Sequence, residues 1–291
     1  MNKAPDDSAP LMESVLFASD FSAGSMTAFR HALKAALVAR SKLTILHLSP
    51  GVAAAWTEFP GVHETLERWK LLPPGSSRSD VPQPGIEVSK VVARAQTPLK
   101  TVVDHLKANP VDLIVLATHA NDPEAGWMKE SITDPLARKA GQMTLCVPDG
   151  VAGFVSAQDG SISLNSVVIP IASKPEPQPA VAAAARLVAR LQCPQGTFTL
   201  LYVGEPGARP VVQCPIVPGW EWNEITQTGD VIHGIVDTAA KVSADLIVMA
   251  TNGRNGFLDA LRGSHSERVL RTATCPLLTV PNGSLARAAL A

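Results

Sequence analysis

Glycines that follow an apolar run near the end of the chain are the residues best suited to chemistry. The run at 246–249 predicts a buried strand of a parallel sheet. Gly253 lies in the loop after it, and Gly263 and Ser264 stand before a predicted helix at 266–272. Glycines between the carboxyl end of a strand and the amino end of a helix leave backbone N–H groups able to face an anion. The spacing therefore predicts an anion-binding loop.

The neighbours of this loop leave two interpretations open. Arg254, Gly256 and Arg262 add positive charge and backbone freedom, which favours phosphate contact by backbone N–H groups and the Ser264 hydroxyl. The alternative is simple loop closure, with Ser264 as the N-cap of the following helix. An acid, Asp20, ends the first predicted strand, and it is suited either to a ribose hydroxyl or to capping the next helix.

No set of residues typical of catalysis is evident. There is no Gly-Lys-Ser/Thr phosphate loop, no Gly-x-Gly-x-x-Gly after the first strand of either half, and no histidine spacing that suggests zinc. The cysteines have no Cys-x-x-Cys spacing, which favours reduced thiols over a disulfide or a metal ligand; they are Cys146, Cys193, Cys214 and Cys275. An enzymatic role is therefore not predicted from these residues.

Composition excludes several classes of partner. The 291 residues carry a formal charge of −1, with acidic and basic residues interspersed, so no electrostatic footprint for nucleic acid or an anionic membrane is present. The apolar runs are far shorter than the ~20 residues that a membrane-spanning helix needs. The first residues show no apolar signal core, and we expect a cytoplasmic protein.

Strands and helices alternate along the chain, which indicates parallel α/β sheets. In the first half, apolar and alternating patterns predict strands at 14–20, 43–48, 86–93, 112–118 and 144–148, and helices at 26–39, 98–108 and 131–140. The Pro-rich region at about 51–85 breaks this pattern, with a short helix expected at 65–72. In the second half we expect strands at 166–171, 197–203, 221–226, 245–251 and 278–281, and helices at 180–191, 230–242 and 266–272.

The two halves repeat one another. Residues 245–251 match 112–118 at six of seven positions, at an offset of 133 residues. Residues 278–281 match 145–148 at the same offset, apart from one threonine in place of a cysteine. Two separate matches at one offset indicate an internal duplication of about 130–150 residues per copy.

The duplication and the segment between the copies predict the domain organisation. Asp159-Gly160 lies between alternating residues in 153–164, which predicts a hairpin with a two-residue turn. We therefore expect a first domain at 1–150, a hairpin linker at 151–165 and a second domain at 166–291, packed together. The fold class is α/β, with two tandem doubly wound, Rossmann-like parallel-sheet domains.

With the repeat in view, the chain resembles a tandem universal stress protein, a fold similar to adenine nucleotide alpha-hydrolases. Nucleotide-binding members of that family have a glycine, two residues, a second glycine, nine residues, and then Gly-Ser or Gly-Thr. The second half offers Ala250, Gly253 and Gly263-Ser264 at this spacing, and only Ala250 departs from the pattern. The family also places an aspartate at the end of the first strand, which contacts the adenosine end of ATP, and Asp20 matches that position.

The two halves depart from the family pattern in opposite ways. The first keeps Asp20, but all three motif glycines are gone, which leaves His119 and Ser131 as parts of a remnant site. The second keeps the loop but has Ala172 where the acid is expected. The resemblance therefore implies one nucleotide site, in the second half, with Val203 near the adenine and an adenosine end that has lost its acid.

The resemblance implies a function and an assembly. ATP or a related adenine nucleotide, with Mg²⁺, would be a regulatory ligand in a stress response, and the chemistry would be slow ATP hydrolysis at most. The last strands of the two halves would pair within one chain as an internal pseudo-dimer, with a further homodimer left open. The alternative is a structural or interaction protein in which both nucleotide sites have decayed.

Overall fold

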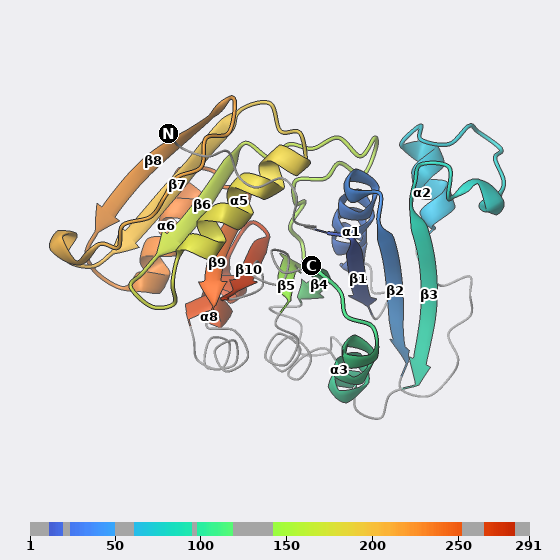
Figure 1. Cartoon of the computed structure of the whole chain (residues 1–291), viewed down its shortest axis with the longest axis horizontal. Coiled ribbons are helices and arrows are strands. Elements are labelled where there is room, and N and C mark those ends of the chain that lie inside the picture. The colour runs from blue at the N-terminus through green and yellow to red at the C-terminus, as the bar shows by residue number, and fades with distance from the viewer. Residues whose placement is uncertain are drawn as a thin grey trace.

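A computed structural model of the chain describes residues 12–19, 24–49, 61–94, 98–118, 142–251 and 265–282 (Figure 1). Its strands form one sheet of ten, in the order β3-β2-β1-β4-β5-β10-β9-β6-β7-β8. In the first half of the chain the strands are β1 (Ser14–Ser19), β2 (Lys42–Ser49), β3 (Glu87–Arg94), β4 (Leu113–Thr118) and β5 (Met143–Pro148). In the second half they are β6 (Ser166–Ile171), β7 (Gly196–Val203), β8 (Trp220–Gln227), β9 (Leu246–Thr251) and β10 (Leu277–Pro281).

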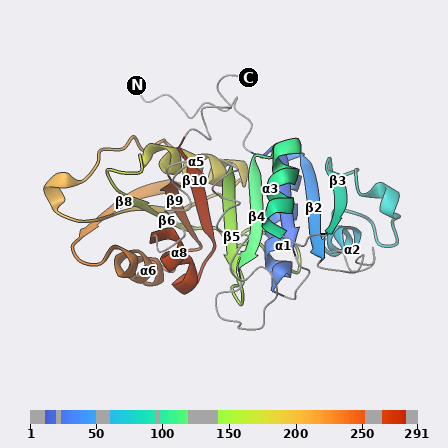
Figure 2. The same cartoon turned by 90° about the horizontal axis from the view of Figure 1, so that it is seen from below.

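The strand order of the second half mirrors that of the first. Within each half all neighbouring strands are parallel. The halves meet at one antiparallel pair, β5 with β10, in which Leu278 lies opposite Leu145. Figure 2 shows these two strands side by side at the centre of the molecule. The pairing of last strands that the family resemblance implies is therefore present within the chain.

Helices cover both faces of the sheet. They are α1 (Ser25–Ala39), α2 (Val62–Arg68), α3 (Pro98–Ala108), α5 (Gln178–Arg190), α6 (Val231–Lys241) and α8 (His265–Thr272). The buried faces of α1 and α5 belong to one apolar core that runs across both halves. On the other face α3 packs on the first half, while α6 and α8 pack on the second. Among the helices of the described residues, none has the length and apolar character needed to cross a bilayer.

Two expectations about local structure were wrong. The helix expected at 65–72 lies earlier, at Val62–Arg68, because it starts directly after Gly61. The hairpin linker forms one antiparallel bridge, Val155 to Ile162, closed by the bond from Ser156 N to Ser161 O. Its turn therefore spans four residues, 157–160, rather than two. The helix expected at 131–140 lies outside the described residues.

Carboxylates hold the starts of neighbouring strands at equivalent places in the two halves. Asp245 Oδ2 accepts hydrogen bonds from the backbone N–H groups of Asn165 (2.7 Å) and Ser166 (2.9 Å). In the first half Asp112 Oδ2 accepts from Ser14 N at 3.0 Å. The aspartate that begins both matching segments, 112–118 and 245–251, therefore has a structural role. Asp112 binds the start of β1 beside β4, and Asp245 binds the start of β6 beside β9.

We expect Asp245→Ala to lower the free energy of unfolding by about 2 kcal/mol, because two backbone donors lose a charged acceptor. Urea denaturation followed by circular dichroism measures this loss. Glu221→Ala, at an exposed position of β8, is the control and should leave the midpoint unchanged. Equal midpoints for both variants would contradict the assigned role of Asp245.

Candidate functional site

The predicted phosphate loop joins β9 to α8, and its residues lie outside the described residues. The same is true of most of the other predicted site residues: Gly253, Arg254, Gly256, Gly263, Ser264, Asp20, His119 and Ser131. Ala172 and Val203 are described, together with the strand ends on which the loop is built. The described part of the candidate site is therefore the frame of strand ends from which the loop starts.

The carboxyl ends of neighbouring strands form this frame. Ala172 follows the end of β6, Val203 ends β7, and Thr251 ends β9. In the sheet β6 lies between β9 and β7, with all three parallel. From β6 the chain continues to β7 on one side of β6, and it later returns to β9 on the other side. The strand order of the sheet therefore reverses at β6. Ligands of open α/β sheets bind outside such a switch point, and Ala172 and Val203 lie at its rim.

Two buried polar atoms at this edge have no hydrogen-bond partner among the residues that the structure describes. They are Thr251 Oγ1, on a side chain that is 1% exposed, and Asn282 Oδ1, directly after β10. The two residues are joined through their backbones, because Asn282 N donates to Thr251 O at 2.8 Å. A buried polar atom left without a partner costs about 1–3 kcal/mol. Thr118 Oγ1, at the matching position of the first half, is likewise unpartnered, so the threonine belongs to the repeated frame and only the Asn282 atom is particular to the second half.

The side of the site at Val203 is closely packed. A Cβ at Gly234 of α6 would lie 2.9 Å from Val203 Cγ2 and 2.5 Å from Gln227 Nε2, so only glycine lets the helix approach this closely. Asp230 caps the same helix, with Oδ1 accepting from Ile232 N at 2.9 Å and His233 N at 3.0 Å. These contacts fix an apolar, half-buried Val203 at the end of β7, which suits the face of an aromatic base.

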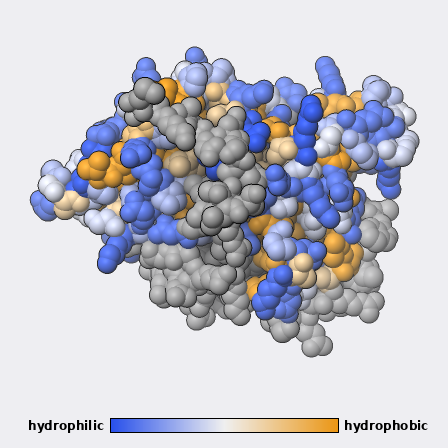
Figure 3. Space-filling model, viewed as in Figure 1, coloured by the Kyte–Doolittle hydropathy of each residue, from blue (hydrophilic) through white to orange (hydrophobic). Residues whose placement is uncertain are grey.

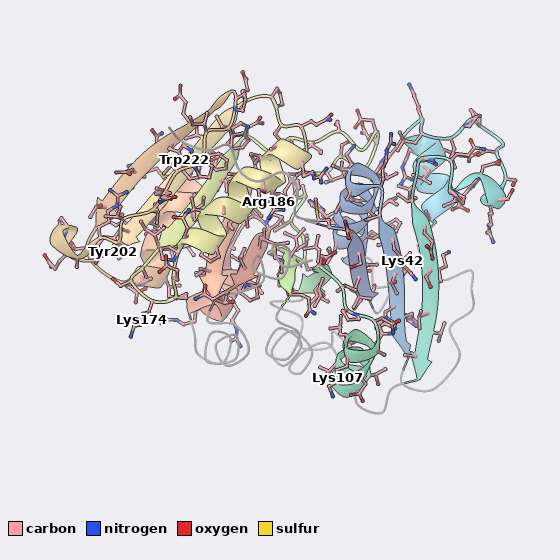
Figure 4. All side chains as sticks on the ribbon, viewed as in Figure 1. Lys42, Lys107, Lys174, Arg186, Tyr202 and Trp222 are labelled. Carbon is pink, nitrogen blue, oxygen red and sulfur yellow. The ribbon has the colours of Figure 1, made fainter. Side chains whose placement is uncertain are left out.

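The rim at Ala172 is exposed and carries no acid. Ala172, Ser173 and Lys174 are all exposed. Figure 4 shows the Lys174 side chain at the end of the second half where β9 also terminates. A methyl group at Ala172 cannot accept a hydrogen bond from a ribose hydroxyl. The Ala172 side chain therefore offers a ligand no hydrogen bond.

The equivalent edge of the first half has a different electrostatic character. Asp149 takes the place of Asn282 there, since its N–H donates to Thr118 O at 2.9 Å. The Asp149 carboxylate lies directly against Gly24, at the amino end of α1. A negative charge at this position would repel a phosphate. This acid was not singled out by sequence reasoning, although the match of 145–148 with 278–281 could have led to it.

The described residues offer no metal centre. No group of three or more His, Cys, Asp or Glu side chains in that part of the chain is arranged to hold an ion. Burial raises the pKa of the Cys146 and Cys275 thiols to about 12 each, so both stay protonated and apolar in character. This agrees with their place in the core of the second half.

The sheet defines a class: an α/β protein with a large, mostly parallel, Rossmann-like sheet whose strand order reverses at β6. Comparison with known proteins gives the family. The model of the universal stress protein family matches residues 12–148 and 221–281, and the chain belongs to this family.

Curated relatives match short segments of the chain. Universal stress protein MJ0531 of Methanocaldococcus jannaschii is 52% identical over 46 residues, which are 16% of this chain and 27% of that protein. Universal stress protein A homolog 1 of Coxiella burnetii is 44% identical over 55 residues, which are 19% of this chain and 38% of that protein. The chain therefore spans less than half the length of these relatives.

Solved structures match the chain over most of its length. A universal stress protein from Archaeoglobus fulgidus has a TM-score of 0.60 at 14% identity, covering 93% of this chain and 99% of that chain. A functionally unknown protein from Pseudomonas aeruginosa PAO1 has a TM-score of 0.57 at 15% identity, with 95% of both chains covered. At these identities the likeness establishes the fold.

Proposed function

We propose that the chain binds ATP, or a related adenine nucleotide, at the carboxyl edge of its second half as a regulatory ligand in a cytoplasmic stress response. The observation that carries the proposal is the near-complete pattern of Gly253, Gly263 and Ser264, in a loop that begins at the β9 end of a switch point. Backbone N–H groups of this loop, with Arg254 and Gly256, would hold the phosphates.

The frame supports this orientation of the nucleotide. Phosphates at the loop would lie beside Thr251 and Asn282, whose unpartnered polar atoms would then gain hydrogen-bond partners directly or through water. The adenine would lie at the other side of the switch point, against Val203. The ribose would pass Ala172 without an acidic contact, so affinity should depend on the phosphates more than on the sugar.

The proposal extends to the organisation of the chain. We assign the first domain to 1–150, the hairpin linker to 151–165 and the second domain to 166–291. The mirrored strand order and the β5–β10 pair support this division into two tandem units that form an internal pseudo-dimer. Mg²⁺ would accompany the phosphates, and we assign no catalytic residue, so hydrolysis is at most slow.

Isothermal calorimetry with ATP and Mg²⁺ tests the nucleotide site. Gly263→Glu should weaken ATP binding by at least about tenfold, because a carboxylate replaces a backbone approach to the phosphates. Gly207→Glu is the matched control: a Cβ at Gly207 meets nothing within 4 Å, so the same charge can be added without a clash. Equal ATP heats for wild type and Gly263→Glu would exclude this site.

A second candidate is an interaction protein of the stress response in which both nucleotide sites have decayed. It is favoured by the division of motif elements between the halves, with Asp20 in one and the glycine loop in the other. The Asp149 carboxylate at the amino end of α1 adds to this interpretation for the first half. Mass spectrometry of the purified protein decides between the candidates, since a nucleotide carried at near one per chain would exclude the second.

A further inference from the structure

The side-chain amide of Gln227 lies beside the place proposed for the base of the nucleotide. Gln227 ends β8 and is paired with Val203, which ends β7, in the parallel register of these strands. The pairing extends one residue further, because Gly204 N donates to Gln227 O at 2.8 Å. Tyr202, the residue before Val203, marks this edge of the second half in Figure 4. Paired residues of neighbouring strands point to the same face of a sheet, so Gln227 and Val203 face the same side.

The amino end of α6 fixes the position of this amide. A Cβ at Gly234 would lie 2.5 Å from Gln227 Nε2 and 2.9 Å from Val203 Cγ2. Both atoms are therefore close to one point on the helix, and the amide lies next to the apolar side chain of Val203. Gln227 is half-buried, so its side chain is held in part by the helix and remains in part accessible to a ligand. The end of the β7–β8 pair thus presents an apolar surface and a polar group side by side.

The second feature of Gln227 is the state of its hydrogen-bonding atoms. Across the ranges that the structure describes, neither the oxygen nor the nitrogen of the Gln227 side chain takes part in a hydrogen bond. Another half-buried glutamine, Gln178, shows what such an amide does when a partner is present. Its Nε2 donates to Gln213 O at 2.9 Å, and its Oε1 accepts from Gln213 N at 2.8 Å. The Gln227 amide can form the same two bonds with a ligand that offers an acceptor and a donor side by side.

The equivalent position of the first half holds a residue of different chemistry. There β2 and β3 take the places of β7 and β8, and Ser49 is paired with Arg94 at their ends. Glutamine forms two hydrogen bonds with adenine, through N6 and N7, whereas arginine forms two with guanine, through O6 and N7. Glutamine at this strand end therefore belongs to the half of the chain that has the nearly complete glycine pattern, Gly253 and Gly263-Ser264.

We propose that Gln227 recognises the base of the bound nucleotide through its N6 and N7 edge and selects adenine over guanine. This inference rests on the proposed function, which places the base against Val203. With its face on Val203, the base has an edge toward the neighbouring amide. The amide oxygen would accept from the adenine N6 amino group, and the amide nitrogen would donate to N7. Guanine has acceptors at both O6 and N7, so one of them would face the amide oxygen without a proton between them.

The same contact would supply polar recognition at the adenosine end of the nucleotide. The Ala172 side chain offers the ribose no hydrogen bond, and Val203 offers the base only apolar contact. Gln227 would therefore carry the side-chain specificity of this end, and selection would act on the base rather than on the sugar. We expect nucleotides that differ only in the base to be distinguished by this residue.

Isothermal calorimetry of the full chain with ATP and with GTP, each with Mg²⁺, tests this inference. The wild type should bind ATP at least about tenfold more tightly than GTP, which is the discrimination expected of one bidentate pair. Gln227→Leu removes both hydrogen bonds and should reduce this ratio several-fold. Gln227→Arg places the residue type of the first half at this position and should shift the preference to GTP. Both nucleotides carry the same phosphates, so the ratio of their affinities reports on the base alone.

A third probe, 7-deaza-ATP, tests the edge of the base, because a carbon replaces its N7 acceptor. The wild type should bind 7-deaza-ATP several-fold more weakly than ATP, while Gln227→Leu should bind the two equally. Thr226→Arg is the matched control, because Thr226 is the exposed residue before Gln227 and faces the opposite side of the sheet. It adds the same charge as Gln227→Arg and should keep the wild-type ratios.

The outcomes separate this inference from the proposed function. ATP binding by the wild type with a ratio to GTP close to unity, or with ratios that neither Gln227 variant changes, would overturn the role of Gln227 and leave the proposed function in place. Absence of ATP binding by the wild type would overturn both. If Gln227→Arg loses its folded circular dichroism spectrum, the ratios of Gln227→Leu decide the question.

Discussion

Replacing Leu278 with alanine is expected to lower the free energy of unfolding by about 3 kcal/mol. Leu278 lies in β10, is 4% exposed, and faces Leu145 across the antiparallel pair that joins the halves. It also lines a cavity of about 30 Å³, whose wall includes His31, Phe154 and Ala183. Because a cavity already lies beside Leu278, truncation to alanine should enlarge that cavity, and the neighbouring side chains should not fill the added space.

Urea denaturation with circular dichroism measures this loss, and Val211→Ala is the control. Val211 is 96% exposed, so its truncation should change stability by less than about 0.5 kcal/mol. On the face in Figure 3, apolar residues form separate patches among polar ones. A loss below about 1 kcal/mol for Leu278→Ala would mean that the β5–β10 pair does not depend on its buried leucines.

The strands were largely predictable because their signal is local. Runs that are apolar after their first residue, such as 166–171, are typical of strands buried on both faces, and the observed β6 has these bounds. The helix Pro98–Ala108 was likewise predicted with its observed bounds, since a proline begins it. The pairing of β5 with β10 did not follow from composition or periodicity and came only from the family resemblance.

Local side-chain hydrogen bonds explain why the linker turn was predicted incorrectly. Asp159-Gly160 is a common two-residue turn, but Asp159 Oδ1 accepts from Ser161 N at 3.0 Å and Ser161 Oγ at 2.7 Å. Ser156 Oγ accepts from Gln158 N at 3.2 Å. These serine and aspartate contacts favour a four-residue turn over a two-residue turn. Composition alone does not show which of the two turns is more stable.

The candidate site was only partly predictable. The glycine spacing gave the loop, because phosphate binding by backbone requires glycine at defined positions. The unpartnered atoms of Thr251 and Asn282 depend on what lies around them in the fold, so no sequence pattern reveals them. The same applies to the Gln227 amide, whose place beside Val203 depends on the pairing of β8 with β7.

Lowering the pH is expected to reduce the free energy of unfolding, because His31 must then be protonated. His31 Nδ1 lies 2.8 Å from Thr27 O and must donate to it, while Nε2 accepts from Phe154 N at 3.1 Å. This arrangement requires the neutral imidazole, which is 2% exposed and packs edge-on against the Phe154 ring. Burial lowers the His31 pKa to about 4, with the charge of Arg30 adding to this and the Thr27 carbonyl opposing it.

The direction of the pH effect follows from the pKa of His31 in the unfolded and in the folded chain. An unfolded histidine has a pKa of 6.5, so between pH 6.5 and about 4 the unfolded chain binds more protons at this site than the folded chain. The contribution of neutral His31 is therefore complete above pH 6.5 and is lost as the pH falls to about 4. The size of the pKa shift corresponds to about 3 kcal/mol.

Urea denaturation at steps from pH 7.5 to 4.5 measures this effect as the slope of the unfolding free energy with pH. His31→Gln should lower stability at pH 7 and reduce the slope by up to about 1.4 kcal/mol per pH unit. Val211→Ala is the control, since Val211 is 96% exposed and carries no titratable group, and it should keep the wild-type slope. Because titrating carboxylates contribute equally to every variant, the difference in slope isolates His31. Parallel slopes for wild type and His31→Gln would show that folding does not hold His31 in its neutral form, which would contradict the prediction.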